Sequence, residues 1–129
     1  MSDIDVQQMI GPSAIMQGAE IKLEEAIRVT REKFPDRSFC IVNEWVWLDL
    51  DAPDLVVEEL ALEGMKPIML LVFEVLFDSS TNSNSHWFRS TPMMDFTDGM
   101  FFQTQNKLYI LLGSGRRTSM SLSAVVRMF

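Results

Sequence analysis

The stretch SHWFRSTPMMDFTDGMFFQT, residues 85–104, decides the fold prediction, because it could form either an active site or a β-hairpin. It contains the only histidine of the chain, set among hydroxyl and apolar side chains. Asp98-Gly99 is a dipeptide that tight hairpin turns favour, and apolar residues flank it on both sides. Pro92 indicates a sheet edge or a bulge in the first half of the hairpin. The stretch therefore predicts paired strands.

Further strands are expected on both sides of this hairpin. Residues 38–50, SFCIVNEWVWLDL, and residues 67–78, PIMLLVFEVLFD, are rich in β-branched and aromatic side chains on both faces, as is typical of central strands. After a turn at Gln105-Asn106, KLYILLG forms one more strand, which Gly113-Ser114-Gly115 is expected to end. These segments together predict a meander.

Helical spacing appears in three other segments. Apolar residues three and four apart predict a helix that begins at about Ser13 or Gln17 and ends at Phe34, before Pro35. A short helix is expected over about 53–63, between a proline near its start and Gly64 as its cap. The chain closes with a short helix from Ser119 or Ser121, because a serine caps an apolar stripe there.

These elements predict a single α+β domain over residues 13–129, with residues 1–12 as a loose N-terminal lead-in. The sheet is expected to be mainly antiparallel, with about five strands. An N-terminal helix, one inserted short helix and a short C-terminal helix accompany it.

Composition indicates a cytoplasmic protein without a membrane segment. The 129 residues include one cysteine, Cys40, so the chain cannot form an intrachain disulfide or a multi-cysteine metal site. The longest apolar run, Ile68 to Phe73, is far too short to span a bilayer. We therefore expect no cofactor and no metal site.

The charge of the chain is unevenly distributed. The formal net charge is −7, yet residues 1–78 hold 16 acids and 6 bases, whereas residues 79–129 hold 2 acids and 5 bases. Seven acids and no base lie between Glu44 and Glu63. Such a surface repels phosphate, which argues against nucleic-acid binding and favours a basic protein partner. The plainer alternative is that the acids only keep the protein soluble.

Two tryptophans accompany this acidic stretch. Trp45 and Trp47 share one face of their predicted strand, where they could form part of the core or an exposed pair of anchors for a partner. If they are anchors, a partner surface with an acidic rim results. Its predicted residues are Glu44, Trp45, Trp47, Asp49, Asp51, Asp54, Glu58 and Glu59.

An anion site is the alternative binding hypothesis. In GSGRR, residues 113–117, backbone amides and two guanidinium groups could hold a phosphate. The glycine spacing fits neither common nucleotide-binding motif. A small nucleotide or nucleic-acid binder would use Lys107, Arg116 and Arg117.

The catalytic candidates are weak, so we expect no enzyme. His86 and Ser90 lie four residues apart on a predicted strand, about 13 Å, which is too far for a base and its nucleophile. Ser85 and Thr91 are the other hydroxyls near this histidine. Glu44 and Glu74 could form an acid–base pair if their strands were adjacent, but exposure or a contact with Arg89 explains them more simply.

A set of aromatic, glycine and polar residues in the C-terminal part of the chain forms a recognisable pattern. These residues are Trp87, Arg89, Ser90, Pro92, Phe96, Gly99, Phe102, Thr104, Asn106, Tyr109, Leu111, Leu112, Gly113 and Gly115. With this pattern the chain resembles a family of small, uncharacterised proteins from pseudomonad genomes and their prophages. The resemblance covers roughly residues 38–117 and departs from the family at Phe88, where valine is expected, and in the 79–86 loop, which lacks the expected glycine and aspartate.

No activity comes with this resemblance. It implies a mobile-element or accessory protein, a class in which small acidic products act by binding and blocking a host or defence protein, as anti-CRISPR proteins do. The expected function is therefore a non-enzymatic, acidic protein-binding module, either monomeric or homodimeric.

Overall fold

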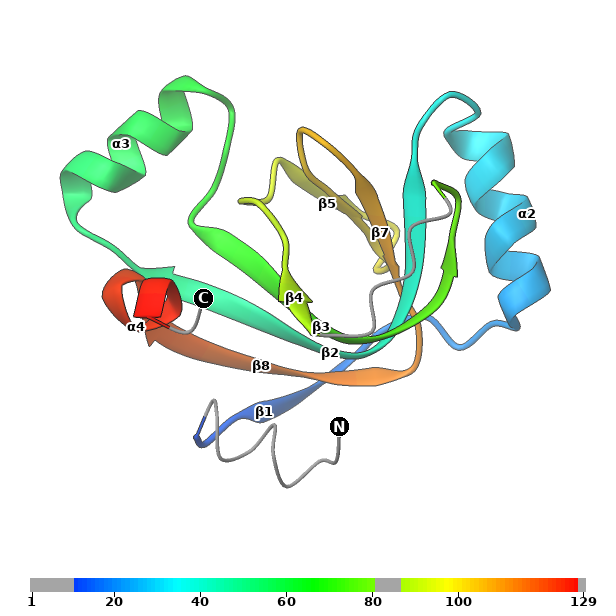
Figure 1. Cartoon of the computed structure of the whole chain (residues 1–129), viewed down its shortest axis with the longest axis horizontal. Coiled ribbons are helices and arrows are strands. Elements are labelled where there is room, and N and C mark those ends of the chain that lie inside the picture. Colours follow the sequence, from blue (N-terminus) through cyan, green and yellow to red (C-terminus); the bar gives the residue numbers. More distant parts are fainter. Residues whose placement is uncertain (1–10, 81–86, 128–129) are drawn as a thin grey trace.

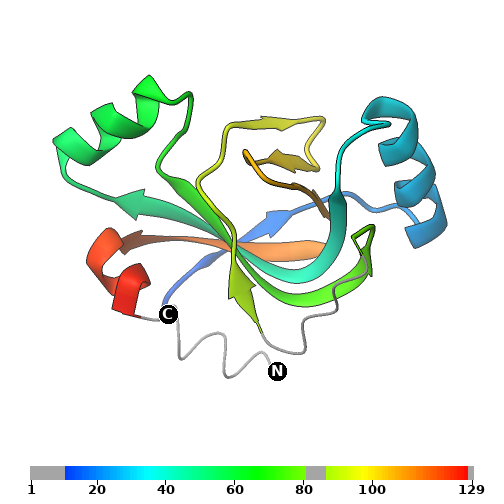
Figure 2. The ribbon, with the colours of Figure 1, turned by 45° about the horizontal axis from the view of Figure 1, so that its top comes forward.

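The computed structural model describes residues 11–80 and 87–127 and shows an α+β domain built on one curled, mixed sheet (Figure 1). Helices α2 and α3 lie at opposite ends of this sheet (Figure 2). The described elements, in chain order, are β1 (Ala14–Gln17), α2 (Leu23–Lys33), β2 (Phe39–Asp51), α3 (Asp54–Leu62), β3 (Ile68–Asp78), β4 (Phe88–Arg89), β5 (Asp95–Thr97), β6 (Phe101–Gln103), β7 (Leu108–Leu111), β8 (Ser114–Ser121) and α4 (Leu122–Arg127).

The predicted α+β class is confirmed, but the sheet differs from the mainly antiparallel, five-stranded one that was expected. Its eight described strands are mixed, because β2 pairs in parallel with both β7 and β8 and antiparallel with β3. β2 is therefore the central strand. The second parallel partner of β2, β8, was not predicted, because Gly113 was expected to end the strand that precedes it, β7.

Gly113 forms a corner and not an end. Its φ of 69° turns the chain after β7, and Ser114–Ser121 then continues along the same edge of β2 as β8. The polar sequence of β8 hides this strand, since its side chains alternate between exposed and partly buried positions. The prediction that Gly113-Ser114-Gly115 ends the strand is wrong for this reason.

The first helix begins later than its periodicity predicts. α2 starts at Leu23, and Ala14–Gln17 instead form the edge strand β1, antiparallel to β8. The Gly18 N–H donates to the Gly113 carbonyl at 2.7 Å, and a Cβ on Gly18 would lie 2.6 Å from the Leu111 carbonyl oxygen. This close backbone approach ties the segment to the sheet.

The 85–104 stretch does fold as paired strands where it is described. It supplies β4, β5 and β6, and β5 and β6 form the predicted hairpin. Asp98 and Gly99 have φ values of 56° and 69°, as a tight hairpin turn requires, and the Met100 N–H donates to the Thr97 carbonyl at 3.1 Å. Pro92 lies in the break between β4 and β5.

The core follows from the curl of the sheet. Trp47 of β2 makes edge-to-face contacts with Phe96 of β5 and Phe102 of β6, with ring centroids 4.9 and 5.4 Å apart, so the far strands close over the centre of the sheet. Outside the curl, Ala26 of α2 and Val125 of α4 are buried in two further apolar clusters. The inner cluster consists of Cys40, Val42, Trp45, Trp47, Leu70, Val72, Met93, Phe102, Tyr109 and Leu111.

A shared corner makes this curl possible. β2 pairs with β7 up to Val42 and with β8 from Val46 onward, and Glu44 between them has a left-handed φ of 49°. Gly113 forms the corresponding corner between β7 and β8. The Trp45 indole lies against this corner, where its Nε1–H donates to the Leu112 carbonyl at 3.0 Å and its ring occupies the space beside Gly115.

Gly115→Ala should destabilise the protein by about 1–3 kcal/mol, because a Cβ at this buried position would lie 2.4 Å from the Trp45 ring. The control is Ser114→Ala, which changes the exposed neighbouring residue and should stay within about 0.5 kcal/mol of the parent. Denaturant unfolding measures both. Equal stabilities for the two variants would show that Trp45 does not need this space.

Candidate functional site

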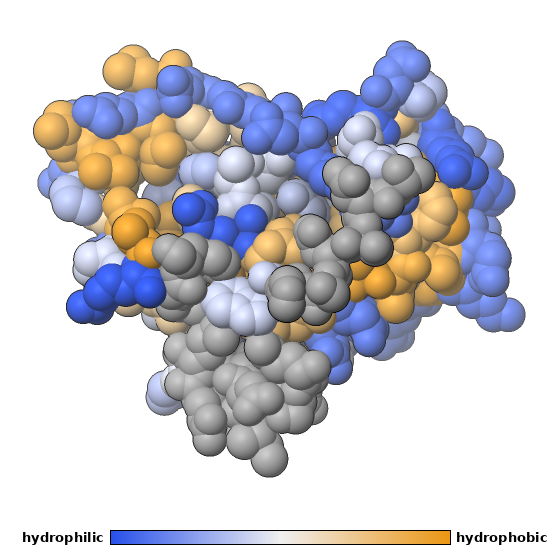
Figure 3. All heavy atoms as spheres, viewed as in Figure 1, coloured by the Kyte–Doolittle hydropathy of each residue, from blue (hydrophilic) through white to orange (hydrophobic). Residues whose placement is uncertain are grey.

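Helix α3 exposes an apolar surface that the rest of the described chain does not cover. Its sequence, DLVVEELAL, contains six apolar residues. The structure describes all nine residues of this helix, and none of them is buried. Leu55 is 66% exposed and Leu62 is 88% exposed. Figure 3 shows the resulting apolar surface over α3. A helix of this composition normally buries one face, so α3 presents an unpartnered surface.

Local sequence signals explain why α3 forms where it does. Pro53 precedes the helix and Asp54 lies in its first turn, where a negative charge is favourable. At the far end, Gly64 adopts a φ of 75° and turns the chain towards β3. The Lys66 N–H donates to the Met93 carbonyl at 2.8 Å, so the chain leaving the helix is tied to the segment before β5. The helix is thus held mainly at its two ends.

A groove runs between α3 and α4. It has a volume of about 540 Å³ and a mostly apolar lining. Val126 of α4, 58% exposed, adds to this surface. Asp51 and Arg127 are its charged residues. The complete lining is Asp51, Pro53, Val56, Ser121, Leu122, Ser123, Val126 and Arg127.

Exposed carboxylates border this apolar surface. Asp51 lies at the end of β2, and Asp54, Glu58, Glu59 and Glu63 lie on α3 or directly after it, all exposed. Helix α3 has no base in its last turn. Part of the predicted acidic face is therefore gathered here, around an apolar centre.

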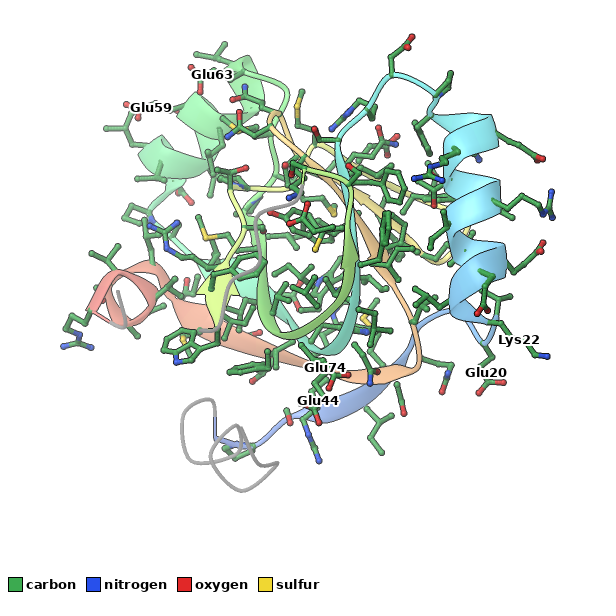
Figure 4. The ribbon with its side chains drawn as sticks, turned by 45° about the vertical axis from the view of Figure 1, so that its right-hand side comes forward. Glu20, Lys22, Glu44, Glu59, Glu63 and Glu74 are labelled. Atoms are coloured by element: carbon green, nitrogen blue, oxygen red, sulfur yellow. The ribbon has the colours of Figure 1, made fainter. Side chains whose placement is uncertain are left out.

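The other half of the predicted face lies elsewhere. Trp45 and Trp47 are 1% and 4% exposed, so their interpretation as core residues is confirmed and they offer no surface to a partner. Glu44 lies at the sheet corner, and Figure 4 shows it beside Glu74 at the opposite end of the molecule from Glu59. The prediction of one continuous surface from Glu44 to Glu59 is wrong, because Glu44 lies at the sheet corner and both indoles are buried in the core.

Asp49 adds no free charge to this surface, because its carboxylate is already paired. Its carboxylate accepts hydrogen bonds from Arg117 at 2.7 and 3.0 Å and from the Trp47 Nε1–H at 3.2 Å. The carboxylate raises the pKa of the Arg117 guanidinium. The Arg117 guanidinium also lies 5.3 Å from the centre of the Trp47 ring. Asp49 therefore orders the side chains over the core rather than adding free negative charge.

The predicted anion-binding residues do not form a cluster. Lys107 binds Asp78 at 2.8 and 2.9 Å, at the other end of the sheet from β8. Arg116 and Arg117 are neighbours on β8, opposite Val46 and Trp47, so their side chains leave opposite faces of the sheet. The three cations cannot converge on one phosphate in this fold.

Among the catalytic candidates, Ser90 has a structural role, and Thr91 has a buried hydroxyl without a hydrogen-bond partner among the described residues. Ser85 and His86 are outside the described residues. Ser90 is buried, and its hydroxyl donates to the Thr91 carbonyl at 2.8 Å and accepts the Leu70 N–H at 2.9 Å. A hydroxyl committed to both bonds is a poor nucleophile.

The remaining titratable groups also suggest structural roles. Glu74 accepts a hydrogen bond from Asn43 Nδ2 at 3.0 Å across the sheet corner. Burial raises the pKa of the Cys40 thiol to about 12, which keeps it protonated and unreactive. In the described part of the chain, no three potential metal ligands gather. None of the helices in that part has the length and apolarity needed to cross a bilayer.

The apolar residues of the candidate site were not expected from the sequence: Leu55 and Leu62 are exposed on α3, and Leu122 and Val126 of α4 line the groove. The signal was present in α3, because Leu55 and Leu62 are seven residues apart and lie on one helical face with Glu58 and Glu59 between them. An apolar residue on the acidic face of a short helix cannot pack into the hydrophobic core and is therefore exposed. That pattern could have identified the surface.

The Lys107–Asp78 pair yields a pH-dependent prediction. Burial disfavours the charged carboxylate, but Lys107 and Ser80 together hold the pKa of Asp78 below its ordinary value. Because the pKa of Asp78 is lower in the folded than in the unfolded state, its ionised carboxylate stabilises the fold at pH values above the unfolded-state pKa of about 3.9. This stabilisation is lost as the pH falls through the folded-state pKa. Asp78→Asn should therefore cost on the order of 2 kcal/mol near pH 7 and progressively less below about pH 4.

Denaturant unfolding at a series of pH values tests this, with the exposed Asp36→Asn as the control that should cost little at any pH. A penalty for Asp78→Asn that stays constant from neutral to acid pH would mean that the ion pair contributes no stability.

Comparison with known proteins places the chain in a family. The family model described as a domain of unknown function, DUF6957, matches residues 17–127, from the end of β1 to the end of α4. No curated protein and no solved structure matches the chain significantly. The matched segment contains the sheet corner, helix α3 and the groove beside α4. The chain therefore belongs to the DUF6957 family, whose function is unknown.

Proposed function

We propose that this protein is a non-enzymatic binding module that docks a basic partner protein on α3 and the adjoining groove. The observation that carries the proposal is the exposure of α3, which has six apolar residues and buries none of its nine described residues. Contiguous apolar surface with a polar rim is typical of protein–protein interaction sites.

The charge around this surface favours a basic partner. Asp51, Asp54, Glu58, Glu59 and Glu63 are exposed around the apolar centre. The negative potential of these carboxylates attracts a basic surface over about a Debye length, roughly 8–10 Å at physiological salt. This attraction increases the association rate of a basic partner. Once the partner is docked, burial of the leucines supplies affinity.

Nucleic acid and small anions fit this surface poorly. The same carboxylates repel phosphate, so counterion release, which drives most protein–nucleic acid association, would not operate here. Two of the bases on which the alternative relied, Lys107 and Arg117, are held by Asp78 and Asp49. Arg116 instead lies within hydrogen-bond distance of the Ser13 hydroxyl, at 3.3 Å.

Blocking another protein is one role that such a module could fill, since an inhibitor needs an occupied surface and no catalytic group. A pseudomonad or prophage origin, which the sequence resemblance implies, would suit an inhibitor of a host or defence protein. This role belongs to the proposal and rests on the same surface.

Affinity purification from the source organism tests the proposal. The tagged protein should enrich a basic partner, and binding should weaken as salt increases. The triple variant Asp54→Lys, Glu58→Lys, Glu59→Lys should bind at least about tenfold more weakly, a loss of roughly 1.4 kcal/mol.

The matched control is Glu20→Lys, Glu24→Lys, Asp36→Lys, which changes the net charge equally at exposed acids away from α3. It also places one lysine in the first turn of a helix, as the test variant does. Failure to enrich any partner would contradict the proposal, as would binding that ignores both salt and the test variant.

A further inference from the structure

The outer face of α3 has a specific pattern. Leu55 and Leu62 are seven residues apart, which places them about 20° apart around the helix and roughly 10.5 Å apart along it. Both are largely exposed. Val56, Val57 and Leu60, by contrast, are partly buried and face the body of the domain. The two leucines therefore form a stripe on the side of α3 that faces away from the sheet, called here the leucine stripe.

Two carboxylates flank the leucine stripe. Glu58 and Glu59 follow Leu55 by three and four residues, so they lie one on each side of the line that joins the two leucines. Both are exposed and both lie midway between the leucines along the axis. An apolar seam bordered by charge on each side is the arrangement by which one helix selects another in a coiled coil.

We infer that the leucine stripe docks an amphipathic helix of the partner, whose apolar side chains pack on Leu55 and Leu62 and whose Lys or Arg residues pair with Glu58 and Glu59. This inference rests on the proposed function and specifies the partner. Because α3 is a helix with its backbone hydrogen bonds satisfied internally, it offers side chains and no open backbone edge to an extended strand. A contact along nine residues, roughly 13.5 Å, needs two to three turns of the partner helix.

Charge decides against the competing occupants. A second copy would bring Glu58 and Glu59 against the same carboxylates, and α3 has no Lys or Arg to compensate. Residues 1–10 of the chain contain Asp3 and Asp5 and no base, so they lack the complementary charge as well. An anionic lipid surface would be repelled in the same way.

Two labelled peptides, each added to the full chain, test the inference. The first is a two-heptad peptide with leucine and isoleucine at the seam positions and lysine at both flanking positions, which also prevents it from pairing with itself. The second has the same composition plus two central prolines, so it cannot form a helix. Fluorescence anisotropy measures binding, and backbone amide NMR shifts show where the peptide binds.

The helical peptide should bind at least about tenfold more tightly than the proline peptide and shift the amides of α3. Leu55→Ser with Leu62→Ser should abolish this binding without unfolding the chain, because both positions are exposed. Ile15→Ser, at another apolar residue that is 75% exposed, should leave binding unchanged.

Three outcomes would overturn the inference. If both peptides bind α3 equally, helix recognition is wrong, while the proposed basic partner stands. If light scattering shows a dimer that the double leucine variant dissociates, the occupant is a second copy. If neither peptide shifts α3, the stripe is not a helix-docking site, and partner capture with the charge-reversed variant then decides separately whether the proposed function survives.

Discussion

The fold depends on the packing of Trp45 against the corner of the sheet. Its indole fills the space that Gly115 leaves open and donates to the Leu112 carbonyl at 3.0 Å, on either side of the turn at Gly113. This contact joins β2 to both of its successive parallel partners, β7 and β8. With the corner fixed, the sheet can curl, and the aromatic side chains of the far strands close over its centre.

The same corner determines where function can lie. The Trp45 indole packs against it and the Trp47 indole is buried as well, so the two candidate aromatic anchors stabilise the core instead. The corner also separates Glu44 from the acids of α3, which lie at the other end of the domain (Figure 4). What remains available for binding is a helix held mainly at its ends, with leucines exposed between carboxylates.

Local sequence signals predicted the elements whose conformation is determined by residues close together in the chain. These elements are β2, α3, β3 and the Asp98-Gly99 turn. The parallel pairing of β8 could not be predicted in this way, because it depends on Gly113 acting as a corner that only the distant Trp45 explains. The candidate site was half predicted, since Asp54, Glu58 and Glu59 follow from charge alone. The exposure of Leu55 and Leu62 was signalled only by their seven-residue spacing around Glu58 and Glu59, which places both leucines on the acidic face of a short helix.

The most direct measurement of the central claim, that α3 is a docking surface for a basic partner, is site-specific cross-linking in cells. A photoreactive amino acid at Leu62 is compared with the same group at Ile15, both being exposed apolar positions. Position 62 alone should capture one protein, through a Lys- or Arg-rich helical segment identified by mass spectrometry. Capture of the same proteins from both positions, or of a second copy of this chain from position 62, would contradict this claim.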